Sequence, residues 1–95
     1  MIIKNANEYN FIEFKKSITK NKKYDAFLRN KTTNKIKRVP FGSVNYQQYE
    51  DATGLNLYSH LNHYDKKRRT LYRKRHEGEQ KNKYSSGWFS WFYLW

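Results

Sequence analysis

The sequence predicts an α+β fold, in which a β-hairpin packs against three or four short helices within a single small domain. Residues 22–29 and 35–41 alternate between apolar and polar side chains, as paired strands do. A strongly basic run at 65–76 begins with an aspartate, which is a good helix cap. The aromatic residues near the end of the chain recur at helical spacing.

Length and composition allow only one small core. The chain has 95 residues, of which 37% are hydrophobic and 19% are aromatic. Large rings bury much area per residue, so a core can form although the hydrophobic content is low. Twenty Lys and Arg against eight Asp and Glu give a net charge of +12, which attracts polyanions, nucleic acid above all. The absence of cysteine excludes disulfides, thiolate metal sites and cysteine nucleophiles.

Residues 5–18 are predicted to form a helix. The positions with helical spacing i, i+3, i+4 and i+7 are Phe11, Phe14, Lys15 and Ile18. A short strand over residues 11–14 is the alternative. The predicted organisation is therefore an N-terminal helical extension over residues 1–21 and a small basic α+β domain over residues 22–95.

The hairpin is predicted from alternation in its first arm and from turn chemistry. Tyr24, Ala26 and Leu28 share one face of that arm, and residues 30–34 are polar enough to supply the turn. Pro40 lacks an N–H, so its end of the second arm is expected at a sheet edge or just past the pairing. Because an isolated hairpin is marginal in water, helices must cover one of its faces.

The middle of the chain predicts further short helical pieces. Residues 44–52 could form a helix with Ser43 as its cap and Gly54 as its left-handed stop. Residues 55–61 carry a half-helical apolar pattern, and residues 77–83 are expected to be a loop.

The run DKKRRTLYRKRH at residues 65–76 is predicted to be a basic helix, capped by Asp65 and stopped at Gly78. On a wheel of about 100° per residue, Leu71 and Tyr72 face the core and two arginines project between them. These inward residues, Arg68 and Arg75, are expected to lay their stems on the core and to pair with a carboxylate. The candidate carboxylates are those of Asp25, Glu50 and Asp51. The outward face carries the candidate nucleic-acid-binding residues, which are Lys66, Lys67, Arg69, Arg73, Lys74 and His76.

A cationic helix face is usually only a solvated surface, but this run lacks the expected mixture of signs. No acidic residue lies between Asp65 and Glu77, whereas solvated helices commonly carry opposite charges four residues apart. The uncompensated repulsion favours a phosphate-bearing partner. Further basic clusters at 15–23 and 31–38 spread charge over the surface, which favours contact with a nucleic-acid backbone over reading of its bases.

Six of the last eight residues are aromatic. Ser85 or Ser86 could cap a last helix, and the rings with the spacing of one helical face are Trp88, Trp91, Phe92 and Trp95. We expect most of them to be core. A protein contact surface is the second interpretation and insertion into a membrane surface is the third. A stacking platform for single-stranded nucleic acid would instead need these rings exposed. The apolar run is too short to cross a bilayer, and no signal peptide is visible.

No catalytic residue, metal site or cofactor is predicted, so the chain is not expected to be an enzyme. His60 and His63 could share a metal ion by spacing, but no thiolate or supporting carboxylate accompanies them. Paired carboxylates for magnesium, a nucleophile elbow and a phosphate-binding glycine loop are all missing from the sequence.

Four stretches, KKYDAFL, KRVPFG, YQQYEDATGLNLYSHLNHYDKKRRTLYRKRH and SGWFSWFYLW, resemble a family of small basic proteins of nucleocytoplasmic large DNA viruses, the giant viruses. The similarity runs from about Lys22 to Trp95 and is strongest at residues 39–42, 65–76 and 93–95. The resemblance implies a viral setting, in the virion or in the virus factory of the host cytoplasm, and it adds a structural role in the virion shell to the possible functions.

The predicted function is therefore binding of nucleic acid without sequence specificity, with duplex DNA as the expected form, by a virion-associated or virus-factory protein. The alternative is a minor capsid or cement protein whose charge meets acidic surfaces of a major capsid protein. Cations gathered on one face would favour the first, whereas cations scattered among exposed aromatics and extended segments would favour the second. A third possibility, an adaptor to anionic membranes, needs Trp and Lys on one surface.

Overall fold

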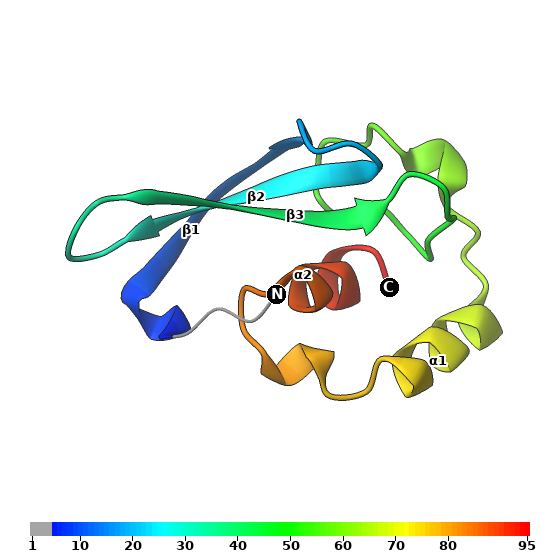
Figure 1. Ribbon diagram of the computed structural model, residues 1–95. Helices are drawn as coiled ribbons and strands as arrows, with labels where there is room; N and C mark the ends of the chain where they lie inside the picture. The colour runs from blue at the N-terminus through cyan, green and yellow to red at the C-terminus, as the bar shows by residue number, and fades with distance from the viewer. Residues whose placement is uncertain (1–4) are drawn as a thin grey trace.

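The structure, a computed structural model, describes residues 5–95 and contains a three-stranded antiparallel sheet and two α-helices (Figure 1). The strands, in sheet order, are β1 (Tyr9–Lys16), β2 (Lys22–Asn30) and β3 (Ile36–Ser43). The helices are α1 (Lys66–Arg75) and α2 (Ser86–Tyr93), and the 3-10 turns are Ala6–Glu8, Ser59–Leu61 and Glu79–Lys81. The α+β class is confirmed, but the sheet has one more strand than predicted, and two α-helices stand in place of three or four short ones.

The predicted hairpin is confirmed as β2 and β3. Tyr24 lies opposite Phe41 and Ala26 opposite Val39, and all four side chains are fully buried on one face. The turn is closed by Asn30, whose side-chain oxygen accepts hydrogen bonds from the backbone N–H groups of Thr32 and Thr33 at 2.9 and 3.0 Å. β3 is an edge strand, which is where its proline was expected.

The predicted helix over residues 5–18 is wrong, because Tyr9–Lys16 is strand β1 and pairs with β2 along its length. The register slips between Phe11 and Glu13, so Ile12 is the extra residue of a β-bulge. This bulge places Phe11 and Phe14, three residues apart, on the same buried side, with ring centroids 4.7 Å apart. The same spacing imitates a helical face. Residues 9–16 therefore belong to the sheet and are not a helical extension.

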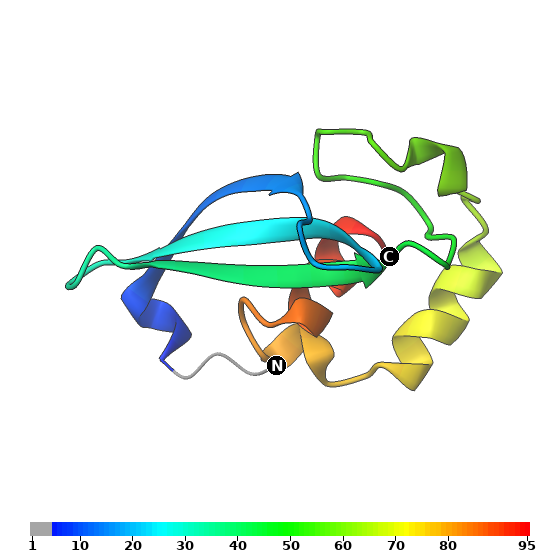
Figure 2. The ribbon, with the colours of Figure 1, turned by 45° about the horizontal axis from the view of Figure 1, so that its top comes forward.

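The helix α2 covers one face of the sheet (Figures 1 and 2). It is capped by Ser85, whose hydroxyl accepts a hydrogen bond from the backbone N–H of Trp88 at 3.1 Å. Its core residue is Phe89, which is fully buried and stacks on Phe41 at 5.4 Å between ring centroids. Leu94 follows and is also buried; its side chain needs Gly42 in β3, where an added Cβ would approach its Cδ1 to 2.8 Å.

The predicted burial of the terminal rings is thus only partly correct. Trp88 and Trp95 pack against the core at its margin, Trp91 is half-buried, and Phe92 is 51% exposed. The helix is turned so that Phe89, which lies outside the predicted face, points at the sheet.

No helix forms over residues 44–52, contrary to prediction. The segment is irregular because its backbone bonds to distant residues, with the N–H of Gln48 donating to Leu61 and that of Ala52 to Tyr93. The hydroxyl of Ser43 accepts from the backbone N–H of Asn45 in a local turn and caps no helix. Residues 44–65 as a whole lead from the end of β3 to the start of α1.

The orientation of α2 can be tested with two phenylalanines of one helix. Phe89→Ala removes a fully buried ring and should lower the free energy of unfolding by about 3–5 kcal/mol. Phe92→Ala removes a half-exposed ring and should cost about 1 kcal/mol or less. Urea denaturation followed by circular dichroism measures both, and equal losses would show that α2 is rotated differently.

Candidate nucleic-acid interface and basic cleft

The basic helix α1 forms where the sequence predicts it. The carboxylate of Asp65 accepts hydrogen bonds from the backbone N–H groups of Lys67 and Arg68 at 2.9 and 3.1 Å, which caps the helix. The helix ends at Arg75, three residues before Gly78, and the glycine has a left-handed φ of 105°. Figures 1 and 2 show that α1 lies beyond the C-terminal end of β3, with one side toward the rest of the molecule and one toward solvent.

The helix is rotated relative to the predicted wheel. Tyr72 faces the body and stacks on Trp95 with ring centroids 4.2 Å apart and planes 5° apart, whereas Leu71 is 48% exposed. Arg68 and Arg75 are exposed, so the prediction that their stems lie on the core is wrong. Arg68 donates to the Oε1 of Gln47 at 2.8 Å instead of pairing with a carboxylate.

The three carboxylates predicted to pair with those arginines either bind other groups or are exposed. Asp25 lies 3.3 Å from Arg38 on the neighbouring strand and accepts from Ser17. Asp51 is buried and accepts from the Tyr24 hydroxyl, while Glu50 is exposed.

The six candidate residues divide into two groups on different sides of α1. Lys66, Lys67 and Lys74 are exposed and form the outer face. The other three, Arg69, Arg73 and His76, are half-buried and lie between Tyr72 and the outer face around the helix.

Each inward residue contacts an aromatic ring. The guanidinium carbon of Arg69 lies 4.5 Å from the ring centroid of Tyr49. That of Arg73 lies 5.2 Å from the ring of Trp91, and one of its N–H groups donates to the Trp95 carbonyl at 3.2 Å. Burial, together with the nearby charge of Arg69, lowers the pKa of Arg73. These arginines hold α1 to the body by cation–π contacts.

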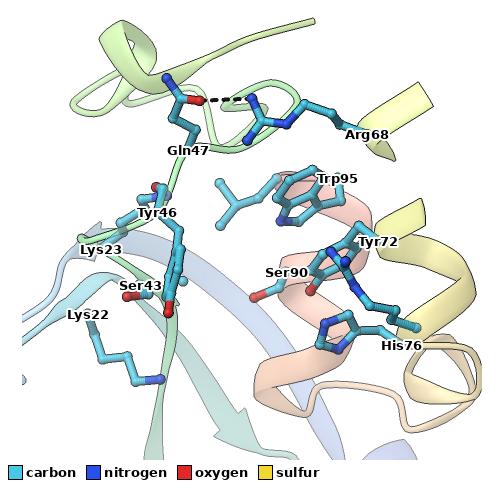
Figure 3. Close-up of a pocket in the computed structure, with 13 residues that line it drawn as sticks. Lys22, Lys23, Ser43, Tyr46, Gln47, Arg68, Tyr72, His76, Ser90 and Trp95 are labelled. Atoms are coloured by element: carbon cyan, nitrogen blue, oxygen red, sulfur yellow. Dashed lines mark hydrogen bonds between the residues drawn. The ribbon is translucent and has the colours of Figure 1, made fainter. Parts of the chain in front are cut away.

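A cleft of about 410 Å³ separates α1 and α2 from the open end of the β2–β3 hairpin, where β2 begins and β3 ends (Figure 3). Its lining contains two lysines, two arginines and one histidine, but no Asp or Glu. The basic side chains of the lining are Lys22, Lys23, Arg68, Arg75 and His76, and its remaining polar side chains include Ser43, Gln47 and Ser90.

The cleft has an aromatic wall and a single ring facing it. On the helix side, Trp95, Tyr72 and His76 form one stack, with Tyr72 and His76 centroids 4.1 Å apart. Across the gap lies Tyr46, which is 71% exposed (Figure 3). Within residues 5–95, its ring has no aromatic or cationic partner. One face of this ring is therefore free for another planar group.

Lys23 is buried at the sheet side of the cleft. Its ammonium donates to the carbonyl of Tyr46 at 2.8 Å and to the side-chain oxygen of Gln48. Burial lowers the pKa of Lys23 to about 8, although the charge of Asp51 acts in the opposite direction. Its ammonium is thus held among neutral acceptors.

The histidines make no metal cluster in the part of the chain that the structure describes, where no group of three or more His, Cys, Asp or Glu could hold an ion. His63 accepts a hydrogen bond from the backbone N–H of Asp65 at 2.9 Å, and burial lowers its pKa. It therefore helps to shape the start of α1. Over residues 5–95, no helix is long and apolar enough to span a membrane.

Comparison with protein-family models, with curated proteins and with solved structures found no match.

The cleft was not predicted from the sequence, although one of its residues, His76, was among the candidate binding residues. The cleft joins the strand residues Lys22 and Lys23 to Tyr46 and to both helices, and it depends on the path of residues 44–64. No local sequence pattern predicts such an arrangement. The only signal was the lack of acids in residues 66–76, which left the arginines of α1 without partners.

The buried lysine predicts a pH dependence of stability. Between pH 8 and about 10.5, Lys23 is neutral in the folded chain and protonated in the unfolded chain, which therefore binds more protons. The free energy of unfolding should rise with pH from about 8 to just below 10, by up to about 1.4 kcal/mol per pH unit. Above pH 10 the trend should reverse, because burial raises the pKa of Tyr24 and of Tyr72 to about 12.

Urea denaturation at pH 7, 8, 9 and 10 measures this slope. Lys23→Met should abolish the rise, and Lys22→Met, at the exposed neighbouring position, should keep it. A stability that is flat from pH 8 to 10 in the unmodified chain would contradict the assignment.

Proposed function

We propose that this chain binds nucleic acid without sequence specificity and without catalysing a reaction, and that the outer face of α1 contacts the phosphates. The observation that carries the proposal is the state of Lys66, Lys67 and Lys74. All three are exposed, and among residues 5–95 none of them takes part in an ion pair. Lysines in this state release condensed counterions when they meet a phosphate backbone, which drives association with duplex DNA.

The distribution of charge in the rest of the chain supports the same partner. Only two ion pairs form within residues 5–95, Arg38 with Asp25 and His76 with Glu79, although the sequence carries twenty Lys and Arg. Most positive charge is thus left for an external polyanion. Lysines without fixed geometry read no bases, which is why the proposed binding is independent of sequence.

The proposed setting, a virion-associated or virus-factory protein, rests on the sequence resemblance alone. The second candidate function is a minor capsid or cement protein. It is favoured by apolar side chains that are exposed away from α1, among them Ile18 at 83% and Ile36 at 56%, and by the irregular course of residues 44–58. A partner protein with acidic and apolar patches could cover such a surface.

The proposal can be tested with the triple variant Lys66→Gln, Lys67→Gln and Lys74→Gln. Loss of three phosphate contacts should reduce the slope of log affinity against log salt concentration by about 3. The measurement is fluorescence anisotropy of a labelled 20-base-pair duplex of arbitrary sequence at several salt concentrations.

A matched control removes three exposed lysines elsewhere, through Lys20→Gln, Lys31→Gln and Lys35→Gln. This variant has the same net charge and should keep most of the slope. Equal losses in the two variants would mean that α1 is no special contact. Affinity of the unmodified chain that is insensitive to salt would reject nucleic-acid binding and would leave the capsid role as the stronger candidate.

A further inference from the structure

We propose that the basic cleft binds one unpaired nucleotide, with its base stacked on Tyr46 and its phosphate held by the cations of the rim. Binding of this kind would extend the proposed function, on which it rests for its partner, from the phosphate backbone of a duplex to an exposed base of a single strand. The cleft and the outer face of α1 lie on opposite sides of that helix, so the two can be tested separately.

The size of the cleft suits a single nucleotide. Its volume of about 410 Å³ falls within the range of roughly 300–1,000 Å³ that small-molecule sites occupy. A paired and stacked base is enclosed within its duplex and presents no free ring face. An unpaired base presents both faces, which is the basis of stacking in single-strand recognition.

The charge of the cleft suits a phosphate. Lys22, Arg68 and Arg75 are exposed at its rim, and within residues 5–95 none of them pairs with a carboxylate. The partner of Arg68 is the neutral amide of Gln47, which leaves its charge uncompensated. No Asp or Glu lines the cleft, so an entering anion meets the positive charges of the rim without an opposing acidic side chain in the lining.

The rings of the cleft suit a base. The ring of Tyr46 reaches into the gap from one side and has a free face (Figure 3). Opposite it, Trp95, Tyr72 and His76 turn their edges toward the gap, since their faces are stacked on one another. A base on Tyr46 would therefore be stacked on one side and meet ring edges on the other, and both are favoured aromatic geometries.

Simpler ligands would use only part of this arrangement. An inorganic anion would contact the rim cations and leave Tyr46 unused, whereas an uncharged aromatic molecule would leave the cations without a partner. A phosphorylated base uses both. The shared chemistry can come from a free nucleotide or from a strand, and both sources belong in the experiment.

The experiment compares Tyr46→Ala with Tyr46→Phe in the full chain. The probes are adenosine monophosphate, adenosine, inorganic phosphate, a labelled ten-residue single strand of deoxyadenosine, and the labelled 20-base-pair duplex, all at one ionic strength. Calorimetry serves for the small molecules and fluorescence anisotropy for the nucleic acids. Because Tyr46 is largely exposed and its contact with Lys23 uses the backbone carbonyl, both variants should fold normally.

We expect the unmodified chain to bind adenosine monophosphate at least tenfold more tightly than adenosine or inorganic phosphate. Tyr46→Ala should weaken binding of the single strand about tenfold, while Tyr46→Phe and the control Tyr64→Ala, an exposed tyrosine outside the cleft, should change it less than twofold. Duplex affinity should be the same in all three variants.

The outcomes separate the two sources and the two proposals. Tyr46-dependent binding of the monophosphate assigns the cleft to free nucleotides as well as strands, and Tyr46-dependent binding of the strand alone assigns it to strands. If neither probe depends on Tyr46, the cleft is not a nucleotide site, even when the duplex binds. If the duplex fails to bind while the Tyr46 dependence persists, the cleft proposal stands and the outer-face proposal falls.

Discussion

The side-chain amide of Gln48 is fully buried, and the arrangement of the molecule depends on its being satisfied. Its NH₂ group donates to the Tyr58 carbonyl at 2.8 Å and to the side-chain oxygen of Asn62 at 2.7 Å, while its oxygen accepts from Lys23. Asn62 also accepts from the backbone of Asp51 at 2.8 Å. Because a buried amide without partners costs about 1–3 kcal/mol, these bonds fix residues 44–64 on β2, and they thereby fix where α1 begins.

Neutral partners explain how so basic a chain folds with only two ion pairs among residues 5–95. Its cations are held by neutral groups: Lys23 by a carbonyl and an amide, Arg69 by a tyrosine face, and Arg73 by a tryptophan face and a carbonyl. Neutral acceptors position a cation without cancelling its charge. The field of the protein therefore remains positive around α1, which is the property that both proposed binding surfaces use.

Local signals were sufficient for the hairpin, the cap of α1 and the cap of α2, because each of these is decided within a few residues. The predictions were wrong where contacts between residues distant in the sequence determine the local structure. The bulge at Ile12 gave β1 a helical spacing, and long-range bonds drew the backbone of Gln48 out of the predicted helix. The rotation of α1 was misjudged because Tyr72 is selected over Leu71 by its stack on Trp95, a residue 23 positions away. Of the candidate site, the three outer lysines were therefore correctly placed at the surface, whereas the cleft depended on contacts that no local pattern encodes.

The backbone bonds between residues 44–52 and the end of α2 have a consequence for synthesis on the ribosome. The sheet uses only residues 9–43, which emerge first and pair in a simple meander. The N–H groups of Tyr49 and Glu50 donate to the carbonyl of Leu94, at 3.0 and 3.1 Å, so this segment cannot order until residue 94 has left the exit tunnel. A nascent chain can thus pair its sheet before it has a cleft, because the cleft is lined by residues of that segment and of both helices.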